Sequence, residues 1–359
     1  MREDDIAAGT EAICRAVLSR FAPRVSPLRI EALIAGGGFS GARIWRIVTE
    51  FGDFALRRWP TTRGLPETRI LGLHRLLEHI WNEGVTFVAV PLKTNDGTTL
   101  PIESGAQWQL EPWMPGVADF HSNPSQERLR AAMMALATWH LAASRFVASE
   151  VVAPWFGRHG AAQSPAVLER LSILEGTEQG PISQVERRIS ADANPAVRDL
   201  ATQVLDQYRR LRQRIMADLR LVREVTVPLQ PVIRDVWHDH VLFTGDEVTG
   251  LIDPSACRME SVACDLSRLI GSLVADDAAA WEFALQEYQR IRPLSSAERT
   301  LATVFDRSGV VLSGWSWLYP RYSFLVNQDR VVTRLNEILM RMRHITDNDP
   351  PSNGKLFLP

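Results

Sequence analysis

The sequence predicts an α+β protein with two lobes, a small antiparallel-sheet lobe that carries one helix and a larger, mainly helical lobe. Residues 1–115 alternate apolar and polar side chains between turn residues, whereas residues 116–345 show helical periodicity. The chain has 359 residues, enough for two cores, because single cores stop growing at roughly 250–300 residues. Residues 346–359 are polar with paired prolines and are expected to form a loose tail.

Each element of the first lobe has its own signal. Apolar residues at helical spacing predict a leading helix over 6–21 and a second helix over 68–81. Alternating residues predict strands, and Gly, Asn and Asp predict the turns between them. The expected strands are one broken by a glycine cluster at 33–42, then 43–48, 54–59, two that flank a turn at 95–97, and 106–111.

The second lobe is expected to consist of helices. Apolar residues recur on related faces over 128–147, and the long segment 194–223 repeats them at steps of three and four. The arginines of that long segment are interpreted as a solvated helix face. Residues 149–193 are rich in Gly, Pro and Ser, and insertions are expected there.

The composition excludes some classes of partner. A net charge of −2 and a pI near 6.5 give no electrostatic case for binding nucleic acid or a membrane. An acidic N-terminus and the absence of any run of about 18 apolar residues predict a cytoplasmic protein. The three cysteines lack metal-ligand spacing and are interpreted as buried, reduced thiols: Cys14, Cys257 and Cys264.

The residues that suggest chemistry gather between positions 232 and 269. Asp235 lies five residues before His240, and a turn at 244–247 leads to Asp253 at the end of an apolar strand. Phosphoryl transfer needs a base beside the accepting hydroxyl and oxygen ligands for a metal ion. Asp235 suits the base, and Asp253 suits Mg²⁺, which demands hard oxygen donors. The alternative for Asp235 is a turn or capping residue.

Five motifs then occur in order within residues 33–272. Residues 110–116 and 136–140 precede the loop 233–240, which reads Ile-Arg-Asp-Val-Trp-His-Asp-His. An Ile-Asp pair that ends at Asp253 is followed twelve residues later by Asp265 and a leucine. These motifs resemble the aminoglycoside phosphotransferase and choline kinase family, a branch of the protein-kinase-like fold. The catalytic loop of that family reads His-Gly-Asp-x-His-x-x-Asn, and its lobes are connected by a segment similar to 110–116.

The resemblance implies a protein-kinase-like fold that binds ATP or GTP with Mg²⁺, or with Mn²⁺ in its place. It implies that Asp235 is the catalytic base and that Asp253 is a metal ligand. Asp265 is expected to be structural and to bond the loop backbone. The nucleotide-binding residues would be, in chain order, Gly36, Gly37, Gly38, Ser40, Arg57, Glu111 and Trp113.

Several positions depart from the family pattern. Arg57 replaces the phosphate-binding lysine, and it is either a phosphate clamp or a surface salt-bridge residue. No glutamate stands clearly where the partner of that lysine belongs; His74 lies nearest, and Glu67 and Glu78 are the other candidates. His240 replaces the metal-binding Asn, and it is either a metal or phosphate ligand or a hydrogen-bonded loop histidine.

The leading hypothesis is a kinase that moves the γ-phosphate of ATP to a hydroxyl of a small molecule. Its rival is a nucleotide-binding or scaffold protein that has lost phosphoryl transfer, which the changes at Arg57 and His240 favour. The acceptor stays open among aminoglycosides, amino alcohols, sugars, homoserine, nucleosides and peptides. A transition-metal cluster of His238 and His240 with nearby aspartates is less favoured. Trp315 and its aromatic neighbours are interpreted as packing residues rather than as a cage for a cationic substrate.

Overall fold

The computed structural model describes residues 3–33, 42–61, 64–157, 160–177, 180–319 and 328–348. The chain forms two compact units. Unit 1 comprises Met1–Arg158 and Asp239–Cys257, and unit 2 comprises His159–His238 and Arg258–Pro359. Unit 1 is therefore larger than the first lobe predicted from the sequence, which ended at residue 115, because it also includes residues 116–158 and 239–257.

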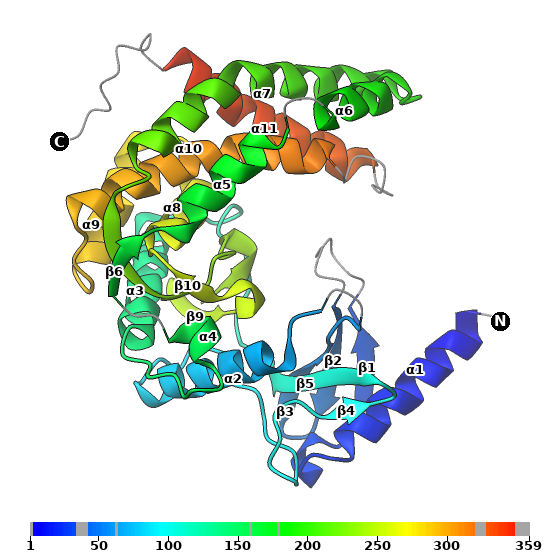
Figure 1. Ribbon diagram of the computed structural model, residues 1–359. Coiled ribbons are helices and arrows are strands. Elements are labelled where there is room, and N and C mark those ends of the chain that lie inside the picture. The colour runs from blue at the N-terminus through cyan, green and yellow to red at the C-terminus, as the bar shows by residue number, and fades with distance from the viewer. Residues whose placement is uncertain are drawn as a thin grey trace. The chain divides into compact units, whose positions relative to one another are not determined.

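Unit 1 contains a five-stranded antiparallel sheet with the order β1-β2-β3-β5-β4 (Figure 1). A two-stranded hairpin, β8-β9, belongs to the same unit. Its elements are α1 (Glu3–Leu18), η1 (Pro23–Val25), β1 (Arg29–Ala32), β2 (Arg43–Thr49), β3 (Gly52–Arg58), α2 (Glu67–Asn82), β4 (Ile102–Glu103), β5 (Ala106–Pro112), α3 (Gln126–Ala143), α4 (Ala153–Phe156), β8 (Val241–Thr244), β9 (Glu247–Leu251) and η3 (Pro254–Ala256).

The two faces of the five-stranded sheet differ, because alternate side chains of a strand point to opposite sides. The apolar face packs against α1 in one core that includes Trp45, Leu56 and Trp108, and Figure 1 shows α1 lying along the sheet. The opposite face carries polar side chains on β5 and beside them on β3, although Ile44, Val48 and Ala55 also lie on it. On that polar face Arg57 of β3 is in register with Gln109 of β5.

The β8–β9 hairpin is held closely by the rest of unit 1. Gly116 has a φ of +99°, and a Cβ at this position would stand 2.4 Å from the hydroxyl oxygen of Thr249. Only glycine combines this backbone conformation with so close an approach. Asp253 follows two residues after the end of β9, so the docking of the hairpin places its backbone. Two isolated bridges complete the docking: Val88 with Leu251, and Val117 with Phe243.

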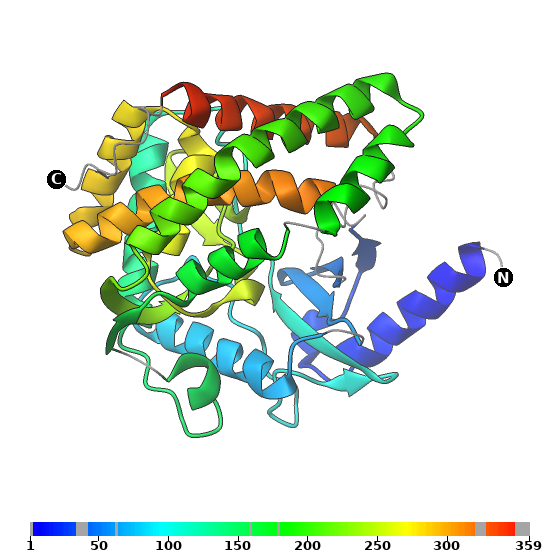
Figure 2. The same cartoon turned by 45° about the horizontal axis from the view of Figure 1, so that its top comes forward.

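Unit 2 is mainly helical. Helices α7, α10 and α11 pack against one another and lie side by side in both views (Figures 1 and 2). A three-stranded sheet has the order β10-β7-β6, and β7 ends three residues before Asp235. The elements are β6 (Gly160–Gln163), α5 (Pro165–Glu175), α6 (Pro181–Ser190), α7 (Pro195–Leu221), β7 (Thr226–Val232), β10 (Arg258–Glu260), α8 (Ala263–Val274), α9 (Ala278–Gln289), α10 (Ser296–Leu318) and α11 (Gln328–Asp347), with η2 (His238–His240) at the boundary between the units.

Most of the elements expected from the sequence are confirmed. The leading helix, the helices at 68–81, 128–147 and 194–223, and the strands at 43–48, 54–59 and 106–111 correspond to α1, α2, α3, α7, β2, β3 and β5. The two strands expected beside the turn at 95–97 are wrong. The backbone N–H of Asn95 donates to the carbonyl of Arg20 at 2.8 Å, and Thr94 bonds locally to Thr98, so the two sides of the turn do not pair as a hairpin. Before the turn only a single bond reaches the sheet, from the N–H of Leu92 to the carbonyl of Leu110 at 2.7 Å, and after it the short strand β4 begins at Ile102.

Predictions outside the main elements have mixed outcomes. Helix α11 includes Thr346 and Asp347, so the expected tail overlaps a helix; residues 349–359 lie outside the described residues, as do 34–41 of the glycine-broken strand. Trp315 stacks on Tyr208 and Tyr319 with ring centroids 5.1 and 5.3 Å away, which confirms a packing role. The three cysteines are free and buried, as expected.

Candidate active site

The predicted phosphate-binding residues fall into two groups. Arg57 is buried on the polar face of the sheet, and its Nη2 atom lies 3.1 Å from Oδ1 of Asp253. The alternative of a surface salt bridge is therefore wrong, and the structure brings these two predicted site residues together within unit 1. Four other residues lie outside the described part of the chain and stay predictions: Gly36, Gly37, Gly38 and Ser40.

Asp253 occupies a strained turn after β9. Its φ of 53° lies in the left-handed region, which residues other than glycine rarely adopt. Burial by itself would raise the pKa of the Asp253 carboxyl, but the positive charges of Arg57 and His240 outweigh burial and hold the pKa below its usual value. The carboxylate is therefore charged at neutral pH and lies beside two basic side chains.

Asp253 also suits a divalent cation. Its Oδ1 atom is buried and, although it faces Arg57, it accepts no well-aligned hydrogen bond. Proteins commonly bind Mg²⁺ through one or two carboxylates together with phosphate oxygens, so a carboxylate oxygen with spare capacity fits this ion. The imidazole of His240 offers no oxygen donor, and its role as a metal ligand stays a prediction.

The histidine cluster considered from the sequence does not form. Residues His238–His240 make the 3-10 helix η2 rather than a strand, so side chains two positions apart do not share a face. His238 belongs to unit 2 and His240 to unit 1. Over the ranges that the structure describes, no group of three or more His, Cys, Asp and Glu side chains could hold a metal ion.

Trp113 follows β5 in the segment that was expected to hold the adenine. Its backbone N–H donates to the carbonyl of Asp53 at 3.0 Å, so this group is already used within the sheet. Its ring lies beneath the guanidinium of Arg46, at 5.0 Å from the ring centroid. Any backbone contact with a nucleotide would therefore come from the neighbours of Trp113, whose groups point the other way.

The residues considered as partners of Arg57 have other contacts. His74 is buried between the hydroxyl of Thr99 and the amide oxygen of Gln109, each 2.8 Å away. Burial lowers the pKa of His74 to about 4, so the imidazole is neutral at pH 7. Two glutamates remain: Glu78 pairs with Lys93 at 2.8 Å, and Glu67 lies exposed in the first turn of α2. In the described part of the chain, none of these three candidates forms an ion pair with Arg57.

Glu111 projects from the polar face of the sheet, and the amide nitrogen of Gln109 donates to its carboxylate. Burial raises the pKa of Glu111, and the charge of Arg57 offsets part of this effect. Arg57 therefore forms an ion pair with Asp253 and feels the charge of Glu111, which lies on the same face of the sheet.

Asp235 lies on a loop after β7, and its side chain is 56% exposed. The Nε and Nη2 atoms of Arg268 both lie 3.2 Å from its Oδ1 atom. The guanidinium of Arg268 also lies over the ring of Trp237, at 5.7 Å from the centroid. The candidate base is thus accessible to solvent and stands beside a planar cation that rests on an aromatic ring.

The backbone before Asp235 is fixed by Asp265. The N–H groups of Ile233 and Arg234 donate to the two oxygens of this buried carboxylate at 2.7 and 2.6 Å, which confirms the structural role expected for Asp265. Arg234 occupies the glycine position of the family motif with a φ of 71°. Its side chain pairs with Glu169 at 2.8 Å and with the buried Glu260 at 3.5 Å.

Three contributors to the site were missed in the sequence: Gln109, Glu169 and Arg268. Arg268 stands three residues after Asp265 on α8, one helical turn away, and this spacing could have indicated it. Gln109 lies two residues before Glu111, on the same face of a strand, which is a weaker signal. Nothing in the local sequence distinguishes Glu169 from an ordinary helix-surface acid.

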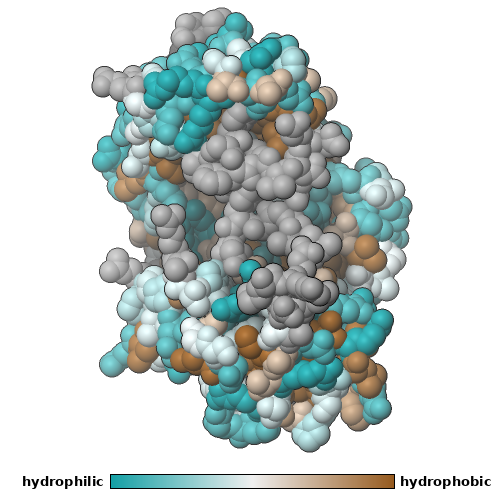
Figure 3. Space-filling view, turned by 90° about the vertical axis from the view of Figure 1, so that its right-hand side faces the viewer, coloured by the Kyte–Doolittle hydropathy of each residue, from teal (hydrophilic) through white to brown (hydrophobic). Residues whose placement is uncertain are grey.

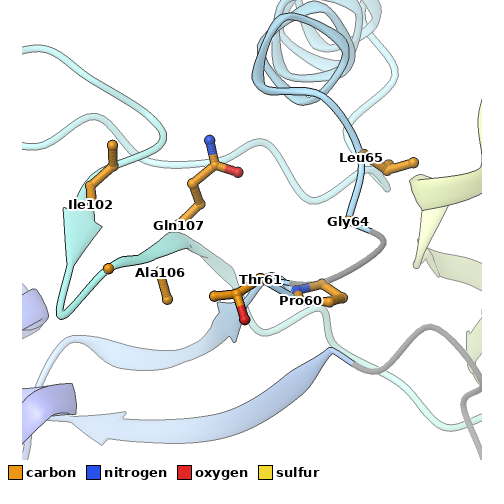
Figure 4. A pocket seen from close by; sticks show the side chains of 8 residues that line it. Pro60, Thr61, Gly64, Leu65, Ile102, Ala106 and Gln107 are labelled. Atoms are coloured by element: carbon orange, nitrogen blue, oxygen red, sulfur yellow. The ribbon is translucent and has the colours of Figure 1, made fainter.

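The pocket shown in Figure 4 is lined by none of these site residues. It has a volume of about 330 Å³ and carries no charged side chain that would hold a phosphate. On the face drawn in Figure 3, apolar residues are scattered among hydrophilic ones wherever the surface is coloured. The residues that line the pocket of Figure 4 come from β4, the start of β5 and the segment between β3 and α2: Pro60, Thr61, Gly64, Leu65, Ile102, Gly105, Ala106 and Gln107.

Comparison with known proteins gives this geometry a family. Residues 31–298 match the phosphotransferase enzyme family. The chain belongs to that family. Homoserine kinase from Agrobacterium fabrum is 23% identical over 264 residues, which cover 71% of each chain. The expectation of a small-molecule kinase is confirmed at the level of the family.

Solved structures share the fold. A spectinomycin phosphotransferase in complex with ADP and spectinomycin has a TM-score of 0.67 and 13% identity, over 93% of this chain and 97% of that one. Amicoumacin kinase in complex with AMP-PNP and Ca²⁺ has a TM-score of 0.62 and 15% identity, over 97% and 95%. The predicted protein-kinase-like α+β fold is thereby confirmed. Within the ranges that the structure describes, no helix has the length and hydrophobicity of a membrane span.

Proposed function

We propose that the protein transfers the γ-phosphate of ATP to a hydroxyl of a small molecule, with Asp235 as the general base and Asp253 as the metal ligand. One contrast carries the proposal. Asp253 is partly buried with one oxygen atom that lacks an aligned donor, whereas Asp235 is exposed on a loop whose backbone Asp265 holds. The first environment suits a cation bound with phosphates, and the second suits an acceptor that must enter and leave.

Unit 1 would bind the nucleotide. Arg57 presents a fixed positive charge to the phosphates, and its guanidinium can donate two parallel hydrogen bonds. The Pro112 carbonyl and the Met114 N–H flank Trp113, and they point away from β3 because Trp113 bonds to it. We expect these two groups to bind the adenine. ADP in the spectinomycin phosphotransferase and AMP-PNP in the amicoumacin kinase support a nucleotide in this family.

Asp253 would hold Mg²⁺, which when bound neutralises charge on the phosphates. Asp235 would orient the acceptor hydroxyl and take its proton as the phosphate is transferred. Positioning by such a base contributes typically 10²- to 10⁴-fold to the rate. The exposure of Asp235 leaves room for an acceptor to reach it.

For the acceptor we propose a hydroxyl compound that carries a carboxylate, with homoserine as the first to be tested. Arg268 lies 3.2 Å from the Asp235 oxygen, so a small acceptor that meets the base also meets this guanidinium. A guanidinium stacked on an aromatic ring is well suited to a carboxylate partner. The similarity to a homoserine kinase agrees with such an acceptor. Cationic aminoglycosides would instead be repelled by Arg268.

The experiment measures ADP formation by the purified chain with Mg²⁺ and either ATP or GTP, with homoserine, a choline-like amino alcohol and spectinomycin as acceptors. We expect turnover with homoserine. The Asp235→Asn variant should lose about 10²- to 10⁴-fold in rate and keep its affinity for ADP, because unit 1 is unchanged. Asp246→Asn, at the exposed tip of the β8–β9 turn, is the matched control and should retain full activity.

The acceptor proposal has its own variant. Arg268→Gln should raise KM for homoserine by tenfold or more and leave KM for a neutral alcohol unchanged. An equal change in KM for both acceptors would show that Arg268 does not bind the carboxylate of the acceptor. Wild-type protein that binds ATP but turns over no acceptor would instead favour the rival hypothesis of a scaffold that has lost phosphoryl transfer.

A further inference from the structure

A line of polar side chains crosses the polar face of the sheet in unit 1. It begins at Thr99, continues through His74 of α2 and Gln109 of β5, and reaches Glu111. Arg57 of β3 is in register with Gln109, and Glu111 is in register with Ala55, so Arg57 and Glu111 are diagonal neighbours on the same face of the sheet. Their opposite charges interact. His74, Gln109 and Arg57 are each at most 5% exposed. Burying so many polar groups is costly unless every one of them has a partner, so the arrangement is specific.

The direction of each hydrogen bond in this line is determined by chemistry. The amide oxygen of Gln109 can only accept, so Nε2 of His74 carries the proton and donates to it at 2.8 Å. In a neutral imidazole Nδ1 then accepts, and its partner at 2.8 Å is the hydroxyl of Thr99. The amide nitrogen of Gln109 in turn donates to the carboxylate of Glu111. The line is therefore a chain of donors that ends on an acid beside Arg57.

A second acid near Arg57 would hold its guanidinium in place when Asp253 binds a cation. In the structure Asp253 is the ion-pair partner of Arg57. A carboxylate that also binds a cation shares its charge and holds the guanidinium less firmly. The helix α2 supplies no replacement, because Glu78 pairs with Lys93 and Glu67 lies exposed in its first turn.

We propose that Glu111 is a positioning residue that holds Arg57 for the phosphates, and that His74 and Gln109 fix Glu111. It takes the place of the helix glutamate that the sequence lacks at this site. The coupling between α2 and Arg57 therefore runs through two neutral side chains and a strand acid instead of one direct ion pair. This inference depends on the proposed role of Arg57 in binding ATP.

Two views of Glu111 predict opposite results. If Glu111 merely adds negative charge near the phosphates, Glu111→Gln should tighten ATP binding, because it removes a repulsion. If Glu111 positions Arg57, the same change should lower kcat by about tenfold and should not lower KM for ATP. The variant keeps the shape of the side chain and an oxygen that can accept from Gln109, so folding is expected to be preserved.

The matched controls are the two glutamates of α2. Glu67→Gln and Glu78→Gln should keep kcat within twofold of wild type. His74→Phe removes the donor to Gln109 and should reproduce the loss in Glu111→Gln, and the double variant should lose little more. A loss of kcat in Glu78→Gln or Glu67→Gln with none in Glu111→Gln would overturn the proposal and restore the helix glutamate.

A second measurement is independent of catalysis. In the folded wild-type chain, ¹⁵N NMR of His74 should show a neutral ring protonated on Nε2, and Glu111→Gln should shift the resonances of that ring. A His74 ring protonated on both nitrogens, or one whose resonances do not change in Glu111→Gln, would contradict the chain of hydrogen bonds. If no acceptor is turned over at all, the proposed function fails, but this readout still decides whether the chain exists.

Discussion

The two carboxylates of the candidate site differ in how they are held. Asp253 in unit 1 is 32% exposed, pairs with a buried arginine and has its pKa lowered by Arg57 and His240 against the effect of burial. Asp235 in unit 2 is 56% exposed and pairs with Arg268, which is itself 37% exposed. The same chemical group is thus fixed in one unit and accessible in the other.

This difference matches the tasks proposed for the two residues. A ligand for a cation and phosphates gains from a rigid environment in which charges are already arranged. A base must meet a hydroxyl that arrives from solvent, so its partner has to be exchangeable. The comparison also predicts where substitutions affect stability and where they affect only rate.

The largest expected effect is that of Asp253→Asn, which should affect both rate and stability. This substitution should lower the rate at least as much as Asp235→Asn does, but it should also destabilise unit 1 by about 1.5–3 kcal/mol, because the buried Arg57 loses the charge of its ion-pair partner. Thermal unfolding followed by circular dichroism, with ADP affinity measured in parallel, tests this. Asp235→Asn, whose side chain is exposed, should unfold at the wild-type temperature. The reverse order of stabilities would show that the environments have been assigned to the wrong residues.

The buried imidazole of unit 1 gives a pH dependence. Burial lowers the pKa of His74 from 6.5 to about 4. Between pH 4 and pH 6.5 the imidazole is therefore protonated in the unfolded chain and neutral in the folded chain. The stability is fully present above pH 6.5 and should fall by about 3 kcal/mol as the pH drops towards 4. Urea unfolding of the wild type and of His74→Gln across this range should show the smaller pH dependence in the variant. Parallel curves would mean that His74 is protonated in the folded protein.

A buried acid in unit 2 should give the opposite slope. Burial raises the pKa of Asp306 from 3.8 to about 6, although Arg341 bonds to both of its oxygens at 3.1 and 2.8 Å. The folded chain then holds a proton that the unfolded chain releases, so stability should fall as the pH rises from about 4 to about 6. The effect should be slightly smaller than that of His74. Asp306→Asn removes the titrating group, and its stability relative to wild type should improve as the pH rises through this window.

The smallest expected effect concerns backbone strain. Asp253 is itself a left-handed residue, with a φ of 53°, and Asp235 directly follows one, Arg234, with a φ of 71°. Arg234→Gly and Arg234→Ala both lose the pairs with Glu169 and Glu260. Only the alanine variant keeps the strain, so glycine should be the more stable by about 1 kcal/mol. Equal unfolding midpoints for the two variants would mean that the loop changes its conformation.

Part of the site could be predicted from the sequence because its residues keep fixed spacings. The interval from Asp253 to Asp265 identified the acid that bonds the loop backbone, and the contacts with Ile233 and Arg234 confirm it. The strands beside the turn at 95–97 could not be judged in this way. Their pattern suits a strand, but Asn95 bonds to the chain after α1, and local periodicity does not report such a contact.

The sequence alone determined the family pattern, the order of the elements and the candidate residues Asp235, Asp253 and Arg57, because helical and strand periods and motif spacings are local properties of the chain. Only the tertiary structure decided what surrounds them. The partners of Arg57 come from β5 and from the turn after β9, and the partner of Asp235 comes from α8. Sheet register and helix packing bring these distant segments together, and the resulting burial and charge set the properties of each carboxylate.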